Sequence, residues 1–518
     1  MPTYQSPRGY VEELAARAPP HEGAATAGAA FVGLAESGPF NRPTLVSNWT
    51  QFTTTFGGFI SGSYLAQSVY GYFMNGGGNC YIVRIGQDPG PSGPAPRSAR
   101  AKQLASGPTA QIGRIKATAI DPGVEPGEVS VEITDPGGDS PSAEAFKVVV
   151  KRNGQVAEEF DGATLGRGKQ NVVTLVNTTS TLVNLEETSS GSLERLPNSE
   201  TALVAPPAAA ALPSTRLSAE DYVGDVADRT GFAGLEAVDE VTMLCVPDLM
   251  SAYQQGAIDL DTVQAVQTAM IAHCELMGDR IAILDPPPGL NAQQIKEWRV
   301  DKARYDSMYA ALYWPWVQTM DPLSGLLAFL PPSGHLAGIW GRNDDTRGVH
   351  KAPGNEVVRG AVDLELNITR NEHDLLNPVG INCIRAFPGR GIRVWGARTL
   401  SSDPAWRYLN VRRLFNYLEE TILNGTNWVV FEPNDEALWA KIRRTIAAFL
   451  VNEWRAGALF GSTPDEAFYV KCDSETNPSE GIDAGQVVCE IGVAPVKPAE
   501  FVIFRLAQFS GGTSLVSE

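Results

Sequence analysis

The sequence predicts a mixed α/β and α+β protein with an inserted all-β domain and an extended arm at each end. Strand and helix patterns alternate after residue 213, which is typical of a mostly parallel sheet covered by helices. Before that point, residues 90–213 show mainly strand patterning. Segments rich in Pro, Gly or Ala flank this region at 87–96 and 203–213. A domain inserted into another fold accounts for this arrangement.

The composition is that of a large, acidic globular protein. The 518 residues include 43% hydrophobic and 19% charged residues, and the formal net charge is −18. Because wrapping duplex DNA requires a basic surface, we expect no nucleic acid partner. The sequence has no apolar run of the ~20 residues that a membrane helix needs, and residues 1–20 lack the apolar core of a signal peptide. We therefore expect synthesis in the bacterial cytoplasm without a signal peptide, and no direct membrane insertion.

The first 89 residues divide into an arm and the first part of a core. Residues 1–25 are polar and contain several prolines, which predicts an extended N-terminal arm. Within the core segment 26–89, residues 63–75 place apolar side chains at helical spacing. This helix should end at Asn75-Gly76, before a buried strand.

Residues 90–213 are the predicted inserted domain. Strands are expected at 112–120, 128–134, 145–152, 155–160 and 171–185. Asn153-Gly154, which separates two of them, is a strong signal for a tight hairpin. The Pro, Gly and Ala residues at both joints indicate an autonomous module.

Residues 214–350 are predicted to form an α/β domain. Ser218 and Asp221 have the spacing of a capping box at the start of a helix. The elements expected after it are strands at 241–247 and 280–286 and helices at 261–277 and 291–313.

Residues 351–496 are predicted to form an α+β domain, and residues 497–518 a second arm. Asp403-Pro404 is a favourable start for a helix whose apolar face continues to Ile422. A second helix should be capped by Asn434 and extend to about residue 456. Strands are expected at 428–433, 467–473, 486–494 and 500–509.

The sequence contains no motif of a catalytic or metal-binding protein. Its 5 histidines and 6 cysteines are scattered without metal-ligand spacing. Asp285 and Glu432 follow predicted strands, where α/β enzymes carry catalytic groups. Each precedes a proline, and the end of a strand at a loop explains both. We therefore expect that the protein is not an enzyme and has no catalytic residue, cofactor or metal.

Eight segments carry a resemblance to a known family. They are SPRGYVEE at 6–13, AAFVGLAESGPFNRP at 29–43, FMNGGGNCYIVRI at 73–85, PPSGHLAGIWGRNDDTRGVHKAPGN at 331–355, LLNPVGINCIRAFPGRGIRVWGARTL at 375–400, WRYLNVRRLFNYLEETI at 406–422, WVVFEPND at 428–435 and APVKPAEFVIFRL at 494–506. Together they resemble the contractile tail sheath family of tailed phages and phage-like injection systems. The match leaves only the insertion uncovered, and Arg8 interrupts the usual Pro-Gly of the family's arm.

The resemblance implies a discontinuous sheath core, an insertion that faces outward, and a structural function. Sheath subunits form six-membered rings that stack helically around an inner tube in a metastable extended state, and they contract to drive the tube through a target envelope. The implied partners are copies of this chain, the inner tube protein, and baseplate and cap proteins. The chain would belong to a phage tail or a phage-tail-like particle, including one released extracellularly. A secreted surface-layer-like β-domain protein and a cytosolic α/β enzyme are the alternatives.

One helix face is a candidate contact with the tube. On a helical projection of residues 436–456, Lys441, Arg444 and Arg455 lie opposite the apolar stripe, with no acid in the strip. By contrast, the polar face of the helix at 404–424 mixes Arg412 and Arg413 with acids, as a solvated face does. A purely basic strip in an acidic chain predicts an anionic partner, here the tube. An ordinary solvated face is the alternative.

The arms are the second candidate interaction site. The C-terminal arm contains an apolar strand pattern that includes Phe501, Val502, Ile503, Phe504 and Leu506. We expect this segment, together with residues 1–20, to leave its own subunit and add strands to a neighbour's sheet.

Overall fold

A computed structural model describes residues 26–86, 109–112, 115–119, 128–136, 145–152, 154–166, 170–180, 182–187, 198–203, 217–322 and 324–505. The chain divides into two compact units, one formed by Met1–Gln87 with Leu212–Glu518 and the other by Asp88–Ala211. The predicted N-terminal arm at 1–25 lies outside the described residues. The further division of the larger unit at residues 350 and 496 stays a prediction.

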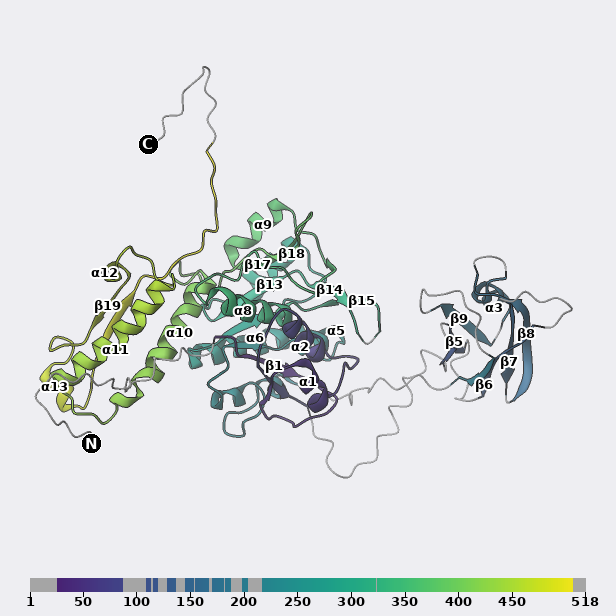
Figure 1. The fold of residues 1–518 in the computed structure, drawn as a ribbon, viewed down its shortest axis with the longest axis horizontal. Coiled ribbons are helices and arrows are strands. Elements are labelled where there is room, and N and C mark those ends of the chain that lie inside the picture. Colours follow the sequence, from purple (N-terminus) through teal and green to yellow (C-terminus); the bar gives the residue numbers. More distant parts are fainter. Residues whose placement is uncertain are drawn as a thin grey trace, which may run out of the picture. The chain divides into compact units, whose positions relative to one another are not determined.

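An eight-stranded sheet forms the centre of the larger unit (Figure 1), in the order β18-β17-β13-β12-β11-β1-β3-β2. Its strands are β1 (Ala29–Gly33), β2 (Thr44–Val46), β3 (Cys80–Arg84), β11 (Met243–Cys245), β12 (Ile281–Leu284), β13 (Ala310–Trp314), β17 (Ile381–Phe387) and β18 (Gly391–Val394). The inner strands pair in parallel, and only the edge strands β2 and β18 are antiparallel to their neighbours. The predicted mostly parallel sheet is confirmed.

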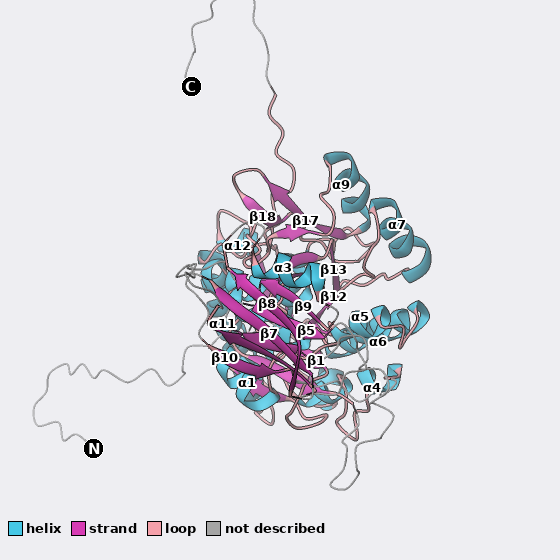
Figure 2. Ribbon diagram, turned by 90° about the vertical axis from the view of Figure 1, so that its right-hand side faces the viewer, coloured by secondary structure: helices cyan, strands magenta, loops and turns pink. Residues whose placement is uncertain are grey.

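Helices cover both faces of this sheet. One face carries α1 (Trp49–Phe56), α2 (Leu65–Met74) and α8 (Ser333–Arg347). The other carries α4 (Ala219–Val223), α5 (Asp248–Gln254), α6 (Leu260–Met277) and α7 (Ala292–Glu297), which continues into the π-helical turn η3 (Trp298–Ala303). Figure 2 shows α5, α6 and α7 in cyan on one side of the larger unit. In β1, Phe31 packs toward the first layer of helices and Val32 toward the second, which explains why this strand reads as a continuous apolar run.

Glycines let α2 and α8 pack very closely. A Cβ atom on Gly334 would lie 2.4 Å from the carbonyl oxygen of Ser68, and one on Gly338 would lie 2.3 Å from that of Tyr72. From the other helix, a Cβ atom on Gly71 would meet the ring of His335 at 2.7 Å. Because any side chain at these positions would separate the helices, the apolar layer on this face depends on glycine.

The remaining part of the larger unit is α+β. Its helices are α9 (Arg370–Leu376), α10 (Leu409–Thr426), α11 (Glu436–Arg455), α12 (Pro464–Ala467) and α13 (Ser479–Asp483), and its strands are β14 (Val317–Met320), β15 (Leu327–Leu330), β16 (Asp363–Leu364), β19 (Phe468–Lys471) and β20 (Glu490–Val493). The long helices α10 and α11 pack together with the two-stranded sheet β19–β20 around a separate core that includes Leu414, Leu418, Ile442 and Phe449.

The smaller unit contains two sheets and one helix, in the described part of residues 88–211. The sheets have the orders β10-β6-β7-β8 and β4-β5-β9. Their strands are β4 (Thr109–Ile112), β5 (Ile115–Ala119), β6 (Val129–Thr134), β7 (Phe146–Arg152), β8 (Gln155–Ala163), β9 (Val183–Glu187) and β10 (Ser199–Ala202). The predicted strand at 171–185 is wrong over α3 (Val172–Thr179), because Asn171 caps a helix there by accepting from the backbone N–H groups of Val173 and Thr174.

Three other predicted elements differ from the structure. The predicted helix 291–313 ends early, and its last residues form the central strand β13. Asp403 makes only a local turn by accepting from the backbone N–H of Ala405, so α10 begins at Leu409. The strand predicted at 428–433 is a 3₁₀ turn (Asn427–Val429) followed by an exposed loop, and the cap of α11 is Asp435 rather than Asn434.

Candidate interaction site

The predicted basic strip lies on the exposed face of α11. The residues buried on the opposite face are Leu438, Trp439, Ile442, Ile446, Phe449 and Leu450. Lys441, Arg444 and Arg455 are all exposed, and none of them forms an ion pair within the described part of the chain. The ammonium group of Lys441 lies 3.9 Å from the centroid of the Trp428 ring, a cation–π contact that fixes its position. The strip is therefore an exposed basic surface of the larger unit.

The arginines of α10 do not form a solvated face, contrary to the prediction. Arg412 and Arg413 are 2% and 4% exposed. Arg413 makes a two-pronged ion pair with Asp344 of α8, with distances of 2.9 and 2.5 Å, and Arg412 lies over the Trp406 ring at 4.4 Å. For Arg413, sequence reasoning missed this because Asp344 lies on another segment of the chain.

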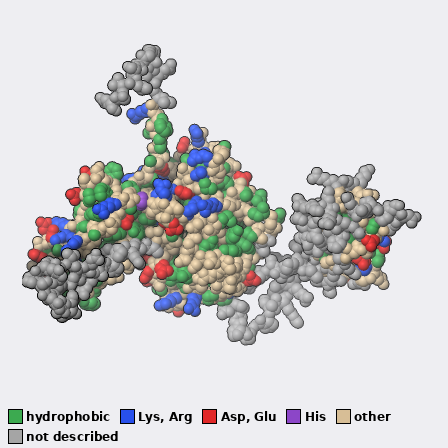
Figure 3. All heavy atoms as spheres, in the orientation of Figure 1, with side chains coloured by type: hydrophobic (Ala, Val, Ile, Leu, Met, Phe, Trp, Pro, Cys, Tyr) green, Lys and Arg blue, Asp and Glu red, His purple; other side chains and the backbone are tan. Residues whose placement is uncertain are grey.

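The C-terminal segment projects from the larger unit with its apolar side chains uncovered. Phe501, Val502, Ile503 and Phe504 are 70%, 68%, 78% and 84% exposed. Figure 3 shows hydrophobic side chains along this projecting segment. Its described residues belong to no strand, and Leu506 lies outside the described residues. Such exposure is typical of a segment that a partner covers.

A carboxylate holds the root of this segment. Glu500 accepts two hydrogen bonds from Arg398, at 2.8 and 2.6 Å, and one from the amide of Asn377 at 2.8 Å. Burial alone would raise the pKa of Glu500, but the hydrogen bonds from Arg398 and Asn377 outweigh it and lower the pKa. The backbone is thus held against the larger unit as far as residue 500, and it projects from that unit after this residue. No local sequence pattern indicated this clamp, because Arg398 and Asn377 are distant in the sequence.

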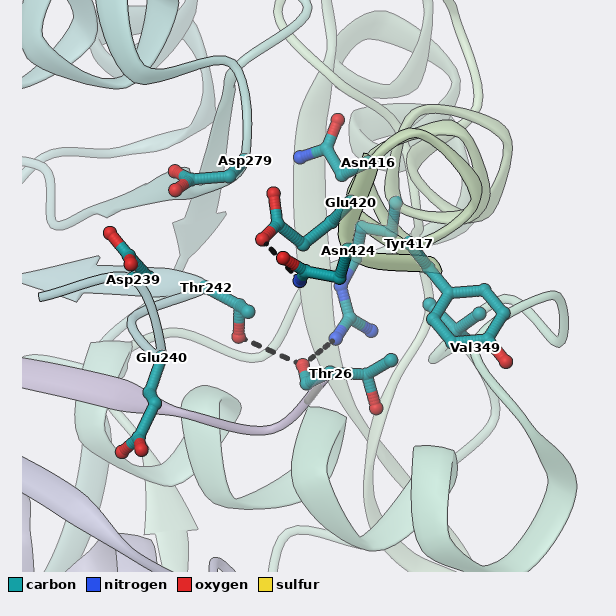
Figure 4. A pocket seen from close by; sticks show the side chains of 11 residues that line it. Thr26, Asp239, Glu240, Thr242, Asp279, Val349, Asn416, Tyr417, Glu420 and Asn424 are labelled. Atoms are coloured by element: carbon teal, nitrogen blue, oxygen red, sulfur yellow. Dashed lines mark hydrogen bonds between the residues drawn. The ribbon is translucent and has the colours of Figure 1, made fainter. Parts of the chain in front are cut away.

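Two of the hollows in the described part of the chain lie beside α10. The larger, with a volume of about 630 Å³, lies beside the root of the C-terminal segment and is lined by Lys351, Trp395, Tyr408 and Glu500 among others. The smaller has a volume of about 130 Å³ and brings together Asp239, Glu240, Asp279 and Glu420. Figure 4 shows these acids around Thr26, whose carbonyl oxygen accepts from the hydroxyl of Thr242. The same oxygen accepts from Arg413, so the first described residue is held beside α10.

The two strand-end acids have structural positions. Asp285 is buried, and it accepts from the backbone N–H of Ser333 at 2.9 Å and from its hydroxyl at 2.5 Å, at the start of α8. Burial raises the pKa of Asp285 to about 7, against these two hydrogen bonds. Glu432 is exposed in the loop before α11. Asp285 thus holds the start of a helix in addition to ending a strand.

The cysteines, the potential metal ligands and the apolar helices of the described residues also bear on the kind of site that the chain can form. Every cysteine is a free thiol, and all except Cys489 are buried. No group of three or more His, Cys, Asp or Glu side chains in the described part of the chain could hold a metal ion. Within the same residues, no helix has the length and apolar character to cross a membrane.

Two family models match adjacent parts of the chain. The phage tail sheath protein central domain matches residues 218–400, and the phage tail sheath C-terminal domain matches residues 401–509. Together they cover more than half of the sequence. The chain belongs to the phage tail sheath family.

Curated relatives agree with this assignment. The chain is 26% identical to the tail sheath protein of Vibrio phage KVP40 over 301 residues, which are 54% of this chain and 44% of the relative. It is 22% identical to the tail sheath protein of Enterobacteria phage T4 over 315 residues, 57% of this chain and 46% of the relative. The chain therefore spans about half the length of these sheath proteins.

Solved sheath structures share the fold over almost the whole chain. The contracted helical sheath of the anti-feeding prophage aligns with a TM-score of 0.58 at 23% identity, covering 98% of this chain and 100% of that chain. The contracted PVC sheath complex of an extracellular contractile injection system aligns with a TM-score of 0.58 at 22% identity, covering 98% and 99%. At these identities the likeness shows the fold alone.

Proposed function

We propose that this chain is the sheath subunit of a contractile injection machine. Its copies polymerise as helically stacked rings around an inner tube in a metastable extended state, and they contract to drive the tube through a target envelope. The observation that carries the proposal is the consecutive match of two tail sheath domains over residues 218–509. A structural role of this kind requires no catalytic group, cofactor or metal.

The proposed partners follow from the same observation. Chains with this fold occur in the baseplate and in the helical sheath of the anti-feeding prophage, which supports self-association and association with a baseplate. The proposal also includes that the subunits form six-membered rings and that they contact an inner tube and a cap protein. The chain would accordingly be part of a phage tail or a tail-like particle, including one released extracellularly.

The basic strip of α11 is the proposed contact with the tube. Lys441, Arg444 and Arg455 project from a helix whose other face is anchored in a core, so their spacing along the helix is fixed. Exposed charge pairs contribute roughly 0–1 kcal/mol each. Repetition along a filament would let such weak pairs set the register of sheath on tube, and their weakness would let the sheath release the tube when it expands.

The arms are the proposed links between subunits. Residues 501–505 are uncovered, and the β19–β20 sheet has only two strands among the described residues. The outer edges of a two-stranded sheet offer backbone groups to which a further strand can add. If the arms of neighbouring copies add to these edges as strands, the backbone groups of the arm and of the sheet edge form hydrogen bonds with one another. Arms tied in this way would keep subunits connected while their cores rotate.

Electron microscopy of the purified protein tests the proposal. A sheath subunit should form helical tubes with a hollow lumen. Flat sheets would instead support a surface-layer-like β-domain protein, and discrete particles under all conditions would support a cytosolic α/β enzyme. Coexpression with the inner tube protein of the same particle should lengthen and straighten the tubes, because the proposed tube is the template for the extended state.

A further inference from the structure

The loop between α10 and α11 presents an aromatic side chain that the fold does not use. Phe431 has an exposed fraction of 102%, and its neighbour Val430 is 63% exposed. The same loop belongs to the segment WVVFEPND, in which residues 428–433 predict a strand. The structure instead turns two of these apolar side chains outward, next to the exposed Glu432 and Pro433.

Phe431 also adopts a strained backbone conformation. Its φ is +70°, in the left-handed region that bulky residues rarely adopt. Such a conformation is unfavourable for a bulky residue, and it persists only where the surrounding structure enforces it. Here no packing within the described residues compensates for it, because the ring is wholly exposed.

Contacts on both sides hold this loop in place. Before it, the indole N–H of Trp428 donates to the carbonyl oxygen of Gly425 at 3.0 Å. After it, Asn434 accepts from the indole N–H of Trp439 at 2.8 Å and donates to the carbonyl oxygen of Gln486 at 2.9 Å. Phe431 is therefore presented on a loop fixed at both ends, as preorganised binding residues are.

The loop is continuous with the basic strip of α11. Lys441 of the strip stacks on Trp428, three residues before Phe431. Lys441 thus lies beside the start of the loop that carries Phe431, so a partner surface that covers Lys441 can extend to this loop. Glu432 follows Phe431 in the chain and is exposed. The complementary surface would therefore have an apolar pocket for Phe431, acidic groups toward α11 and a hydrogen-bond donor for Glu432.

We infer that Phe431 is an anchor residue that inserts into an apolar pocket of the acidic partner contacted by the basic strip. This inference rests on the proposed function, in which that partner is the inner tube. In this arrangement the buried side chain of Phe431 contributes most of the affinity, as aromatic residues do at the centre of many interfaces. The surrounding charges determine the register of sheath on tube. The backbone strain is then a cost of presenting the ring.

Three variants and one control test the anchor on tubes assembled from the inner tube protein of the same particle. The variants are Phe431→Ala, Phe431→Gly and the triple reversal Lys441→Glu, Arg444→Glu, Arg455→Glu. The control is Leu276→Ala, which removes an apolar side chain of α6 that is 75% exposed. The measurements are cosedimentation with tubes at low and high salt, polymerisation without tubes, and the melting temperature.

We expect both Phe431 variants to lose tube binding by about tenfold or more at either salt concentration, while the control binds as the wild type does. Phe431→Gly should melt no lower than the wild type, because glycine adopts a φ of +70° without strain. The triple reversal should lose binding mainly at low salt.

Other results overturn the inference in distinguishable ways. If the Phe431 variants bind tubes normally but the triple reversal does not, the anchor is wrong and the proposed tube contact stands. If the Phe431 variants and the triple reversal all bind normally, the proposed contact of α11 fails as well. If the Phe431 variants no longer polymerise in the absence of tubes, the partner of Phe431 is a second copy of this chain. If both Phe431 variants have a lower melting temperature, Phe431 has a structural role instead.

Discussion

At the scale of single residues, a buried ion pair joins two long helices of the larger unit. Arg413 of α10 and Asp344 of α8 are both almost inaccessible, and Arg413 also lies 4.8 Å from the centroid of the Trp340 ring. Two facing charges of this kind contribute little net stability, but the removal of one leaves the other uncompensated. The pair therefore specifies how α10 sits on α8.

We expect Asp344→Ala to lower the free energy of unfolding of the larger unit by roughly 3–5 kcal/mol. The cost arises because the guanidinium of Arg413 would remain buried without its partner. Denaturant titration followed by tryptophan fluorescence measures the loss. The double variant Asp344→Leu, Arg413→Met should recover much of it. If Asp344→Ala alone were neutral, the pair would not be buried as described.

Asp285 should make stability depend on pH. Burial raises its pKa from an ordinary value near 3.8 to about 7, so the folded state holds the proton more tightly than the unfolded state. Stability from this group is therefore fully present below pH 4 and is lost as pH rises toward 7. Asp285→Asn removes the titration and keeps an oxygen that can accept from Ser333. Its melting temperature relative to the wild type should rise between pH 4.5 and pH 8. A constant difference would contradict the prediction.

At the scale of elements, the sequence predicted those that are determined by local patterns. The capping box of Ser218 and Asp221, the helices α2, α6 and α11, and the parallel strands β11 and β12 all form where spacing and composition indicate. The strand predicted at 428–433 failed because a short apolar run has the same pattern whether it is buried in a sheet or exposed for a partner.

The candidate site was predictable only in part, for a related reason. The exposure of Lys441, Arg444 and Arg455 follows from helical periodicity, which is local. The burial of Arg413 and the clamp on Glu500 depend on partners that the fold brings from distant parts of the chain. The strained loop at Phe431 carries no glycine that would have indicated a positive φ.

The N-terminal arm gives a prediction at the same scale. Deletion of residues 1–20 should leave a soluble protein that no longer polymerises. Four or five strand-type hydrogen bonds at roughly 0.5–1.5 kcal/mol each would supply a tether of a few kcal/mol per subunit, and their loss would weaken every contact along the filament. Sedimentation and electron microscopy measure the effect, with the full-length chain as the control. Long sheaths from the deletion variant would refute the role of this arm.

At the scale of the whole molecule, the chain consists of two units that are each built around their own core. The core of the smaller unit includes Val131, Phe146, Val148 and Val176, all buried within that unit. The segments on either side of it, β3 and α4, both belong to the larger unit. The chain thus leaves and re-enters the larger unit around a module with its own buried side chains, as inserted domains do.

Replacement of residues 90–213 by a Gly-Ser linker of about 15 residues should preserve polymerisation and the wrapping of tubes. A flexible linker of this length costs little in loop-closure entropy. Among the residues that the structure describes, no buried side chain in the two cores of the central sheet comes from the replaced region. The matched control is the isolated segment 88–211, which should be soluble and melt cooperatively because its core is self-contained. Electron microscopy of the replacement variant, with and without tubes, gives the readout. If the isolated segment folds but the shortened chain forms no sheath, the module contributes to the contacts between subunits, and its proposed place on the outside of the sheath is wrong.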